Sequence, residues 1–212
     1  MGRGKLVVFE GIYGSGRLIV HHVNRLREIL ASQGSEVYEI DSPDSGRAQL
    51  MGAQELDGSW RYGIFKADFF FELASRARVC SVINQELEQG KVVLCKNFTL
   101  SSIVHARLKD HDWFREDLYS LESLARSIKF GVRVIPDLTI FMDVPPESAV
   151  KELGKKLDTH FFKSTDLVLQ QKYFLEELAK IPGEKTRIID AQRHEEEVFA
   201  ETLSAVQALL VP

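Results

Sequence analysis

Three glycines near the start of the chain have the spacing of a phosphate-binding loop. Gly11 and Gly16 are separated by four residues, as in the pattern G-x-x-x-x-G-K-[ST], and Gly14 lies between them. An apolar run precedes this segment and a helical pattern follows it. Backbone N–H groups of such loops bind phosphate at the start of a helix. The candidate phosphate-binding residues are therefore Gly11, Gly14, Ser15, Gly16 and Arg17.

The side chains that would complete this motif are different. Arg17 stands where the pattern has lysine, and Leu18 stands where it has serine or threonine. Arginine keeps the positive charge and can hold a phosphate through two parallel hydrogen bonds. Leucine cannot coordinate Mg²⁺, because that ion requires oxygen ligands. The sequence therefore predicts the backbone half of a phosphate site, without the half that would hold a metal.

Neither the histidines after the loop nor the cysteines indicate metal or redox chemistry. His21 and His22 have no carboxylate at ligand spacing, so we interpret them as surface or partly buried side chains and assign no metal ligand. Cys80 and Cys95 are the only cysteines, one in a helical pattern and one at the end of an apolar run. We expect both to be reduced, buried thiols of a cytosolic protein.

The bulk composition excludes several classes of function. The chain has 212 residues, of which 44% are hydrophobic and 27% charged, which is typical of one globular domain over residues 1–212. The net charge of −4 offers no basic footprint for nucleic acid. No run approaches 18 apolar residues, and no secretory signal is apparent. We therefore expect a cytoplasmic protein whose partners include neither nucleic acid nor a membrane.

Strands and helices alternate along the chain. Short apolar runs predict strands over 5–9, 36–40, 91–95, 138–142 and 186–190. Helical spacing is found over 18–30, 65–89, 113–129, from 146, 167–180 and 195–210. This order predicts an α/β fold with a parallel five-stranded sheet and helices on both faces. Ligands of such sheets bind at the carboxyl ends of the strands, so we expect the following loops to converge there: 10–18, 41–46, 96–102 and 143–165.

The order of several motifs resembles that of thymidylate kinases. "VVFEGIYGSGR" is similar to the family's opening "FEGxDGxGKT", and "LASRA" to its helix segment "AxDRA". "GKVVLCKNFTLSS" resembles "GxxVxxDRYxxSS", and "PDLTIFMDVPPESAV" resembles "PDLTxxLDVxPExA". The resemblance runs nearly from end to end. It implies a P-loop nucleoside-monophosphate kinase fold and a homodimer, which we expect to form through the helices of residues 65–89 and 113–131.

This chain departs from the family pattern at positions that serve phosphoryl transfer. The acidic residue within the family's loop is Tyr13 here, and the Asp-Arg pair after the third strand is Lys96-Asn97. The family's Arg-Glu-Pro-Gly is the segment 41–44, "DSPD", so another arginine for the acceptor is absent. Lys96 reverses a charge beside the expected Mg²⁺ position, where two cations would repel. Since phosphoryl transfer depends on positioning and electrostatic stabilisation, these replacements together imply little turnover.

The resemblance also implies a substrate pocket around the helix arginine, Arg76. The aromatic that stacks on thymine in the family lies four residues earlier, which corresponds to Glu72, with Phe71 beside it. Ser101 keeps the family pattern after the third strand, although serine there also caps helices. Arg76 either points into the crevice, as the resemblance implies, or forms a structural ion pair with neighbours such as Glu72.

Three functions follow from these residues. The first, which we expect, is a thymidylate kinase-like pseudokinase that serves binding or assembly, with an unknown protein partner and without an assigned catalytic residue or certain cofactor. The second is a divergent active kinase that phosphorylates dTMP, with ATP and Mg²⁺ as its cofactors. The third is a regulator that binds a nucleotide without turning it over.

Overall fold

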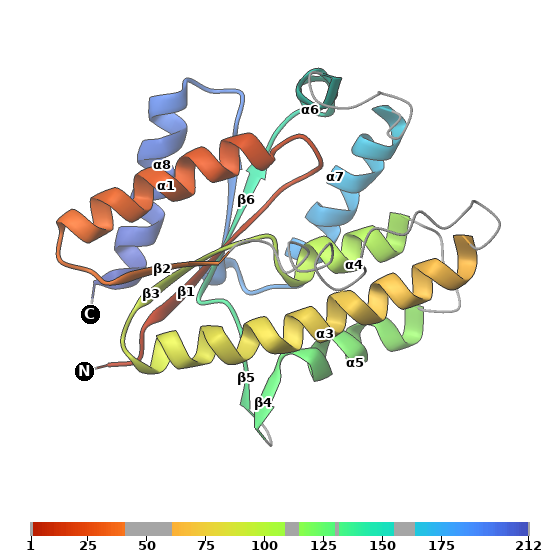
Figure 1. The fold of residues 1–212 in the computed structure, drawn as a ribbon. Helices are drawn as coiled ribbons and strands as arrows, with labels where there is room; N and C mark the ends of the chain where they lie inside the picture. Colours follow the sequence, from red (N-terminus) through yellow and green to blue (C-terminus); the bar gives the residue numbers. More distant parts are fainter. Residues whose placement is uncertain (1, 41–60, 109–114, 130–131, 155–163, 212) are drawn as a thin grey trace.

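A five-stranded parallel sheet forms the centre of the molecule (Figure 1). The computed structural model describes residues 2–40, 61–108, 115–129, 132–154 and 164–211. The strand order is β2-β3-β1-β6-β7, and all neighbouring pairs are parallel. The strands are β1 (Lys5–Glu10), β2 (Val37–Ile40), β3 (Val92–Lys96), β6 (Leu138–Asp143) and β7 (Thr186–Asp190). The predicted parallel α/β fold is thus confirmed, with strand ends within one residue of the prediction.

Helices cover both faces of this sheet (Figure 1). One face carries α1 (Gly16–Ser32) and α8 (Glu195–Leu210). The other carries α3 (Arg61–Glu88), α4 (Thr99–Leu108), α5 (Arg115–Ala125) and α7 (Ser164–Leu178). The short α6 (Pro146–Gly154) lies beyond the carboxyl end of β6. Among the described residues, every helix is too short or too polar to cross a membrane.

The central strand β1 supplies side chains to both layers of the core. Val7 and Phe9 pack with α1 and α8, whereas Leu6 and Val8 pack with α3. Successive strand residues point to opposite faces, and both faces of a parallel sheet are covered. The uninterrupted apolar run that begins the chain is therefore the expected pattern for this strand.

One predicted helix is shorter than expected, and one helix was not predicted. The helix predicted over 113–129 ends at Ala125, because Ser127–Lys129 (β4) pairs with Val132–Arg133 (β5) as a small antiparallel ribbon. Ile128 packs there against the cluster beneath α3, and its β-branched side chain favours extended backbone. The helix α4 was not predicted as a separate element. The predicted turn at 41–46 and residues 155–163 of the predicted loop 143–165 lie outside the described residues.

Candidate functional site

The glycine loop joins β1 to α1 at the carboxyl edge of the sheet. Gly14 has a φ of 93°, in the left-handed region that glycine adopts without strain. A Cβ atom on Gly14 would lie 2.7 Å from the carbonyl oxygen of Ala149, so α6 packs directly on the loop. Gly11 packs in a similar way on the buried Ser15. The spacing of these glycines therefore reflects close packing as well as any ligand.

The first turn of α1 faces a cavity of about 500 Å³. Its lining comes from α1, α6, the segments after β6 and β7, and the start of α8, and it includes two carboxylates as well as Arg17: Gly14, Arg17, Leu18, His21, Val144, Ser148, Glu152, Ala191 and Glu195. Ser15 does not cap the helix, because its hydroxyl donates to the carbonyl oxygen of Ile12 at 2.7 Å. The first turn also contains no acidic side chain. The N–H groups and positive dipole at this end of a helix attract anions.

Tyr13 ties the middle of the loop to the helices on the other side. Its backbone N–H donates to Oε1 of the buried Gln170 in α7 at 2.9 Å. Its ring stacks on His105 of α4, with centroids 4.6 Å apart and planes 11° apart. The Tyr13 N–H is therefore already hydrogen-bonded within the protein and is not available to a ligand. The tyrosine ring connects the loop with α4.

Lys96, at the end of β3, forms an ion pair across the sheet. Its ammonium lies 2.5 Å from Oε1 of Glu39 on β2, and only 11% of its side chain is exposed. Glu39 also contacts Arg27 of α1 at 3.2 Å. The next residue, Asn97, has a φ of 56° and donates its N–H to the carbonyl oxygen of Phe9 at 2.8 Å. At this position the protein therefore presents an internally neutralised cation.

Arg76 is buried among three helices of the same layer. Its Nε lies 3.2 Å from Oε2 of Glu122 in α5, and both side chains are almost fully buried. An Nη2 group donates to the hydroxyl of Ser102 in α4, and the guanidinium lies 5.0 Å from the centre of the Phe98 ring. The structure thus places Arg76 in an ion pair, but with α5, which the sequence did not connect to it.

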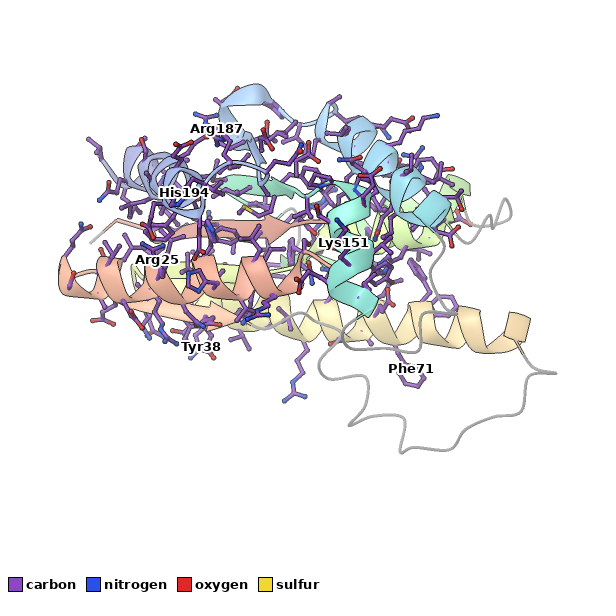
Figure 2. The ribbon with its side chains drawn as sticks, turned by 90° about the horizontal axis from the view of Figure 1, so that it is seen from above. Arg25, Tyr38, Phe71, Lys151, Arg187 and His194 are labelled. Carbon is purple, nitrogen blue, oxygen red and sulfur yellow. The ribbon has the colours of Figure 1, made fainter. Side chains whose placement is uncertain are left out.

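The other residues predicted for the substrate pocket lie in different environments. Phe71 is 36% exposed and projects from α3 away from the sheet (Figure 2). Glu72 is half-buried on the same helix, one turn before Arg76. Ser101 is buried, and its hydroxyl donates to the carboxylate of Glu10. Phe71 is therefore separated from the buried polar groups with which it was predicted to act.

Glu10 was not singled out from the sequence. It is fully buried at the end of β1, where Oε1 also accepts the N–H of Phe98 at 2.9 Å. Burial raises the pKa of this carboxyl to about 7, although hydrogen bonds from Ser101, Phe98 and Leu100 and the Arg76 charge act in the opposite direction. The sequence contains a signal for this, because a carboxylate ends the apolar run "LVVFE". A carboxylate on a buried strand is removed from water, so it needs hydrogen-bond partners within the protein.

The second histidine after the glycine loop and both cysteines lie in the protein interior. His22 is fully buried between α1 and α8, so its prediction as a surface or partly buried side chain was wrong: it lies on the apolar side of α1, against Phe199. Burial lowers its pKa to about 4. Cys80 and Cys95 are buried free thiols, as predicted. Within the described ranges, no three histidine, cysteine or acidic side chains cluster so as to hold a metal ion.

Comparison with known proteins agrees with this fold. A family model described as thymidylate kinase matches residues 9–202. The chain is 30% identical over 215 residues to the thymidylate kinase of Pelotomaculum thermopropionicum, covering 98% of this chain and 95% of that protein. It is 28% identical over 219 residues to the thymidylate kinase of Nitratidesulfovibrio vulgaris, covering 96% of each. A probable thymidylate kinase of Methanococcoides burtonii is 25% identical over 220 residues, covering 98% of each.

Proposed function

Because the chain belongs to the thymidylate kinase family, we propose that it is a cytoplasmic pseudokinase of that family, whose fold serves binding or assembly rather than phosphoryl transfer. The observation that carries this proposal is the ion pair between Lys96 and Glu39. Lys96 stands at the position where the family pattern has an aspartate near the metal. The relatives named thymidylate kinases favour the competing function, a divergent kinase that phosphorylates dTMP with ATP.

The residues present do not fit the Mg²⁺ that the family implies. Leu18 offers no oxygen at the position where the phosphate-loop pattern has serine or threonine. At the neighbouring loop, Lys96 offers an ammonium, which has no lone pair for a metal ion, and this ammonium is already paired with Glu39. The residues at this site therefore do not support a bound Mg²⁺ ion.

The glycine loop supports the same proposal through its backbone. The N–H of Tyr13 is bonded to Gln170, so the loop has one donor fewer for a phosphate chain. The tyrosine also replaces a carboxylate of the family pattern and is stacked on His105. An anion held by the remaining N–H groups and Arg17 would be bound without being activated.

A coupled assay of ADP release with ATP, dTMP and Mg²⁺ tests the proposal. We expect no turnover above background at any protein concentration. The double variant Arg17→Lys, Leu18→Thr should also be inactive, because Lys96 and Asn97 remain. Turnover that rises in proportion to the protein concentration and is abolished by Gly16→Val would establish the divergent kinase instead.

Nucleotide binding without turnover is the second candidate function. It is favoured by the cavity of about 500 Å³ that Arg17 lines at the first turn of α1. Calorimetric titration with ATP separates it from a role in assembly alone. Binding of equal strength with and without Mg²⁺, lost in Arg17→Ala, would support this function, whereas the absence of heat would exclude it.

A further inference from the structure

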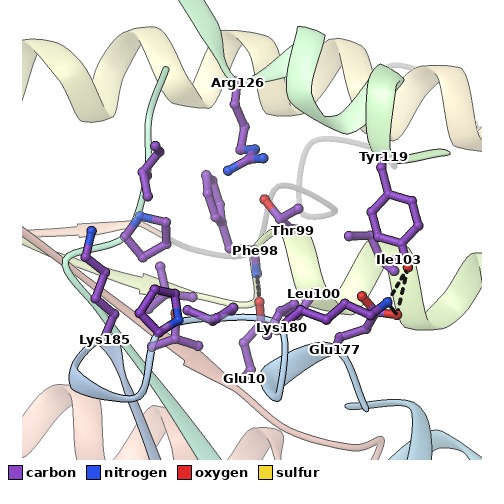
Figure 3. Close-up of a pocket in the computed structure, with 16 residues that line it drawn as sticks. Glu10, Phe98, Thr99, Leu100, Ile103, Tyr119, Arg126, Glu177, Lys180 and Lys185 are labelled. Atoms are coloured by element: carbon purple, nitrogen blue, oxygen red, sulfur yellow. Dashed lines mark hydrogen bonds and ion pairs between the residues drawn. The ribbon is translucent and has the colours of Figure 1, made fainter. Parts of the chain in front are cut away.

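A second cavity, of about 300 Å³, lies on the face of the sheet opposite α1 (Figure 3). It is bounded by β1, β6, α4, α5 and the chain between α7 and β7, which includes the short 3-10 helix η5 (Gly183–Lys185). We call it the lateral cavity and define it by Glu10, Phe98, Tyr119, Arg126, Ile181 and Lys185. It shares no lining residue with the cavity at the glycine loop, so it is a separate site.

The walls of the lateral cavity are largely apolar. Val8 and Phe98 are almost fully buried beneath it, and Pro136, Ile181 and Pro182 close its sides. Concave apolar sites of this kind, with a few convergent polar groups, bind small organic molecules, and about 300 Å³ is at the lower end of their size range. The volume suits a substituted aromatic ring system better than a nucleoside triphosphate.

Two cations reach this cavity from opposite sides (Figure 3). Arg126 extends from the end of α5, and its hydrogen bond is to the backbone carbonyl oxygen of Glu122 at 3.4 Å. Lys185 comes from η5. Neither forms an ion pair with a carboxylate of the described residues, whereas the neighbouring Lys180 lies 2.8 Å from Glu177. Both cations are therefore without a carboxylate at ion-pair distance in the described part of the chain, although the charge of Glu122 acts to raise the pKa of Arg126.

Two further features favour an anionic group beside Arg126. Arg126 is partly buried, and burial lowers the pKa of its guanidinium. A desolvated guanidinium gains strongly from a charge-assisted hydrogen bond with an anion. The hydroxyl oxygen of Thr99, which also lines the cavity, is buried without a hydrogen-bond partner among the described residues. Such a hydroxyl normally has a partner, so it offers a further donor.

We propose that the lateral cavity binds a small organic acid with a flat apolar body and one carboxylate. The apolar body lies against Phe98, Pro136 and Ile181. The carboxylate accepts hydrogen bonds from Arg126 and from the Thr99 hydroxyl, and Lys185 on the opposite side of the cavity adds positive charge (Figure 3). This binding site is independent of phosphoryl transfer and of the glycine loop.

An NMR titration of the ¹⁵N-labelled full chain tests the proposal, with indole-3-acetate as the probe and the neutral indole-3-acetamide as its matched control. We expect indole-3-acetate to bind with a dissociation constant below about 1 mM, and the amide about tenfold more weakly. The shifted amides should be those of Phe98, Thr99 and Ile181. Equal binding of both probes, no binding at millimolar concentration, or shifts confined to residues 14–18 would each overturn the proposal.

Substitutions of single residues test which positive charges contribute to the binding of indole-3-acetate. Arg126→Gln should weaken binding of indole-3-acetate by about tenfold, and Lys185→Gln by about threefold because that lysine is exposed. Lys172→Gln, at an exposed lysine of α7 outside the cavity, should leave it unchanged. Ile135→Trp, at a half-exposed lining residue, should fill the cavity and abolish binding. If Arg126→Gln fails to fold, the other two lining variants, Lys185→Gln and Ile135→Trp, test the proposed site. Unchanged binding of indole-3-acetate in both would refute it.

Discussion

Two cations at positions that serve phosphoryl transfer in the family, Lys96 and Arg76, already form ion pairs within the protein. Lys96 is paired with Glu39 on the adjacent strand, and Arg76 with Glu122 on another helix. For the buried pair of Arg76 and Glu122, removing one partner typically costs about 3–5 kcal/mol, because a desolvated charge is left behind. Both cations therefore contribute to the architecture, and a ligand that recruited either would have to replace an existing partner.

Glu10 should make the stability of the protein depend on pH. Its pKa is about 7 in the fold, against an ordinary value of 4.5. Below pH 4.5 the carboxyl is protonated in both the folded and the unfolded state. Between pH 4.5 and 7 the folded state retains the proton and the unfolded state loses it, so the contribution to stability falls as the pH rises; above pH 7 the loss is complete.

The variant Glu10→Gln isolates this effect, because an amide does not titrate. The difference in the free energy of unfolding, variant minus original protein, should increase from pH 5 to pH 8 by on the order of 1–3 kcal/mol, because only the original protein loses stability over this range. Urea unfolding at both pH values measures the difference. His22 titrates with the opposite sign but is present in both proteins, so its contribution cancels. Parallel pH profiles of the two proteins would contradict the prediction.

At the scale of elements, α6 and α7 determine the shape of the glycine loop. The backbone of Ala149 in α6 lies against Gly14, and Gln170 of α7 accepts the N–H of Tyr13. Because both helices pack in one cluster with Ile12 and Phe141, the loop is held by the same core that covers this face of the sheet. The loop conformation is therefore a property of packing between elements.

Three glycine-to-alanine variants separate the contributions to this packing. Gly14→Ala adds a Cβ 2.7 Å from a backbone oxygen at a φ of 93°, and should destabilise the protein by about 2–4 kcal/mol. Gly34→Ala has a similar φ of 86° in open space and should cost about 1 kcal/mol. Gly16→Ala, at the open start of α1, should be close to neutral. Chemical denaturation measures all three, and equal losses for Gly14→Ala and Gly34→Ala would exclude a tight contact with α6.

At the scale of the whole molecule, apolar side chains remain exposed on the layer that contains α3 and α5. Phe70 on α3 is 53% exposed and Leu124 on α5 is 69% exposed. Exposed apolar patches on a folded protein often mark an interface. We predict a homodimer through these two helices, as the resemblance to the family implied, and expect sedimentation at tens of micromolar to give the mass of two chains.

Charged substitutions should dissociate this dimer. Phe70→Glu and Leu124→Glu each place a carboxylate in the predicted interface, so either should shift the protein toward the monomer without loss of secondary structure. Val168→Glu is the matched control, because Val168 is 52% exposed on α7. A monomer before substitution, or equal effects of all three variants, would reject an interface on α3 and α5.

The elements that the sequence predicted well are those with local signals. The five strands were predictable because apolar runs and helical spacing depend on a few neighbouring residues. The helix end at Ala125 was not, because the pairing of β4 with β5 and the packing of Ile128 override local helical preference. His22 was misplaced for a related reason, since the helix that covers it, α8, lies far along the chain.

By itself, the sequence determined the α/β alternation, the glycine spacing, and the absence of an oxygen ligand at Leu18 and of a carboxylate at Lys96, because these depend only on residue type and local order. Tertiary structure decided the partners: Glu39 for Lys96, Glu122 for Arg76, and Gln170 for the Tyr13 amide, 157 residues away. It also decided the raised pKa of Glu10 and the presence of the lateral cavity. Burial and pairing depend on which distant segments the fold brings together, and no local pattern of residues contains that information.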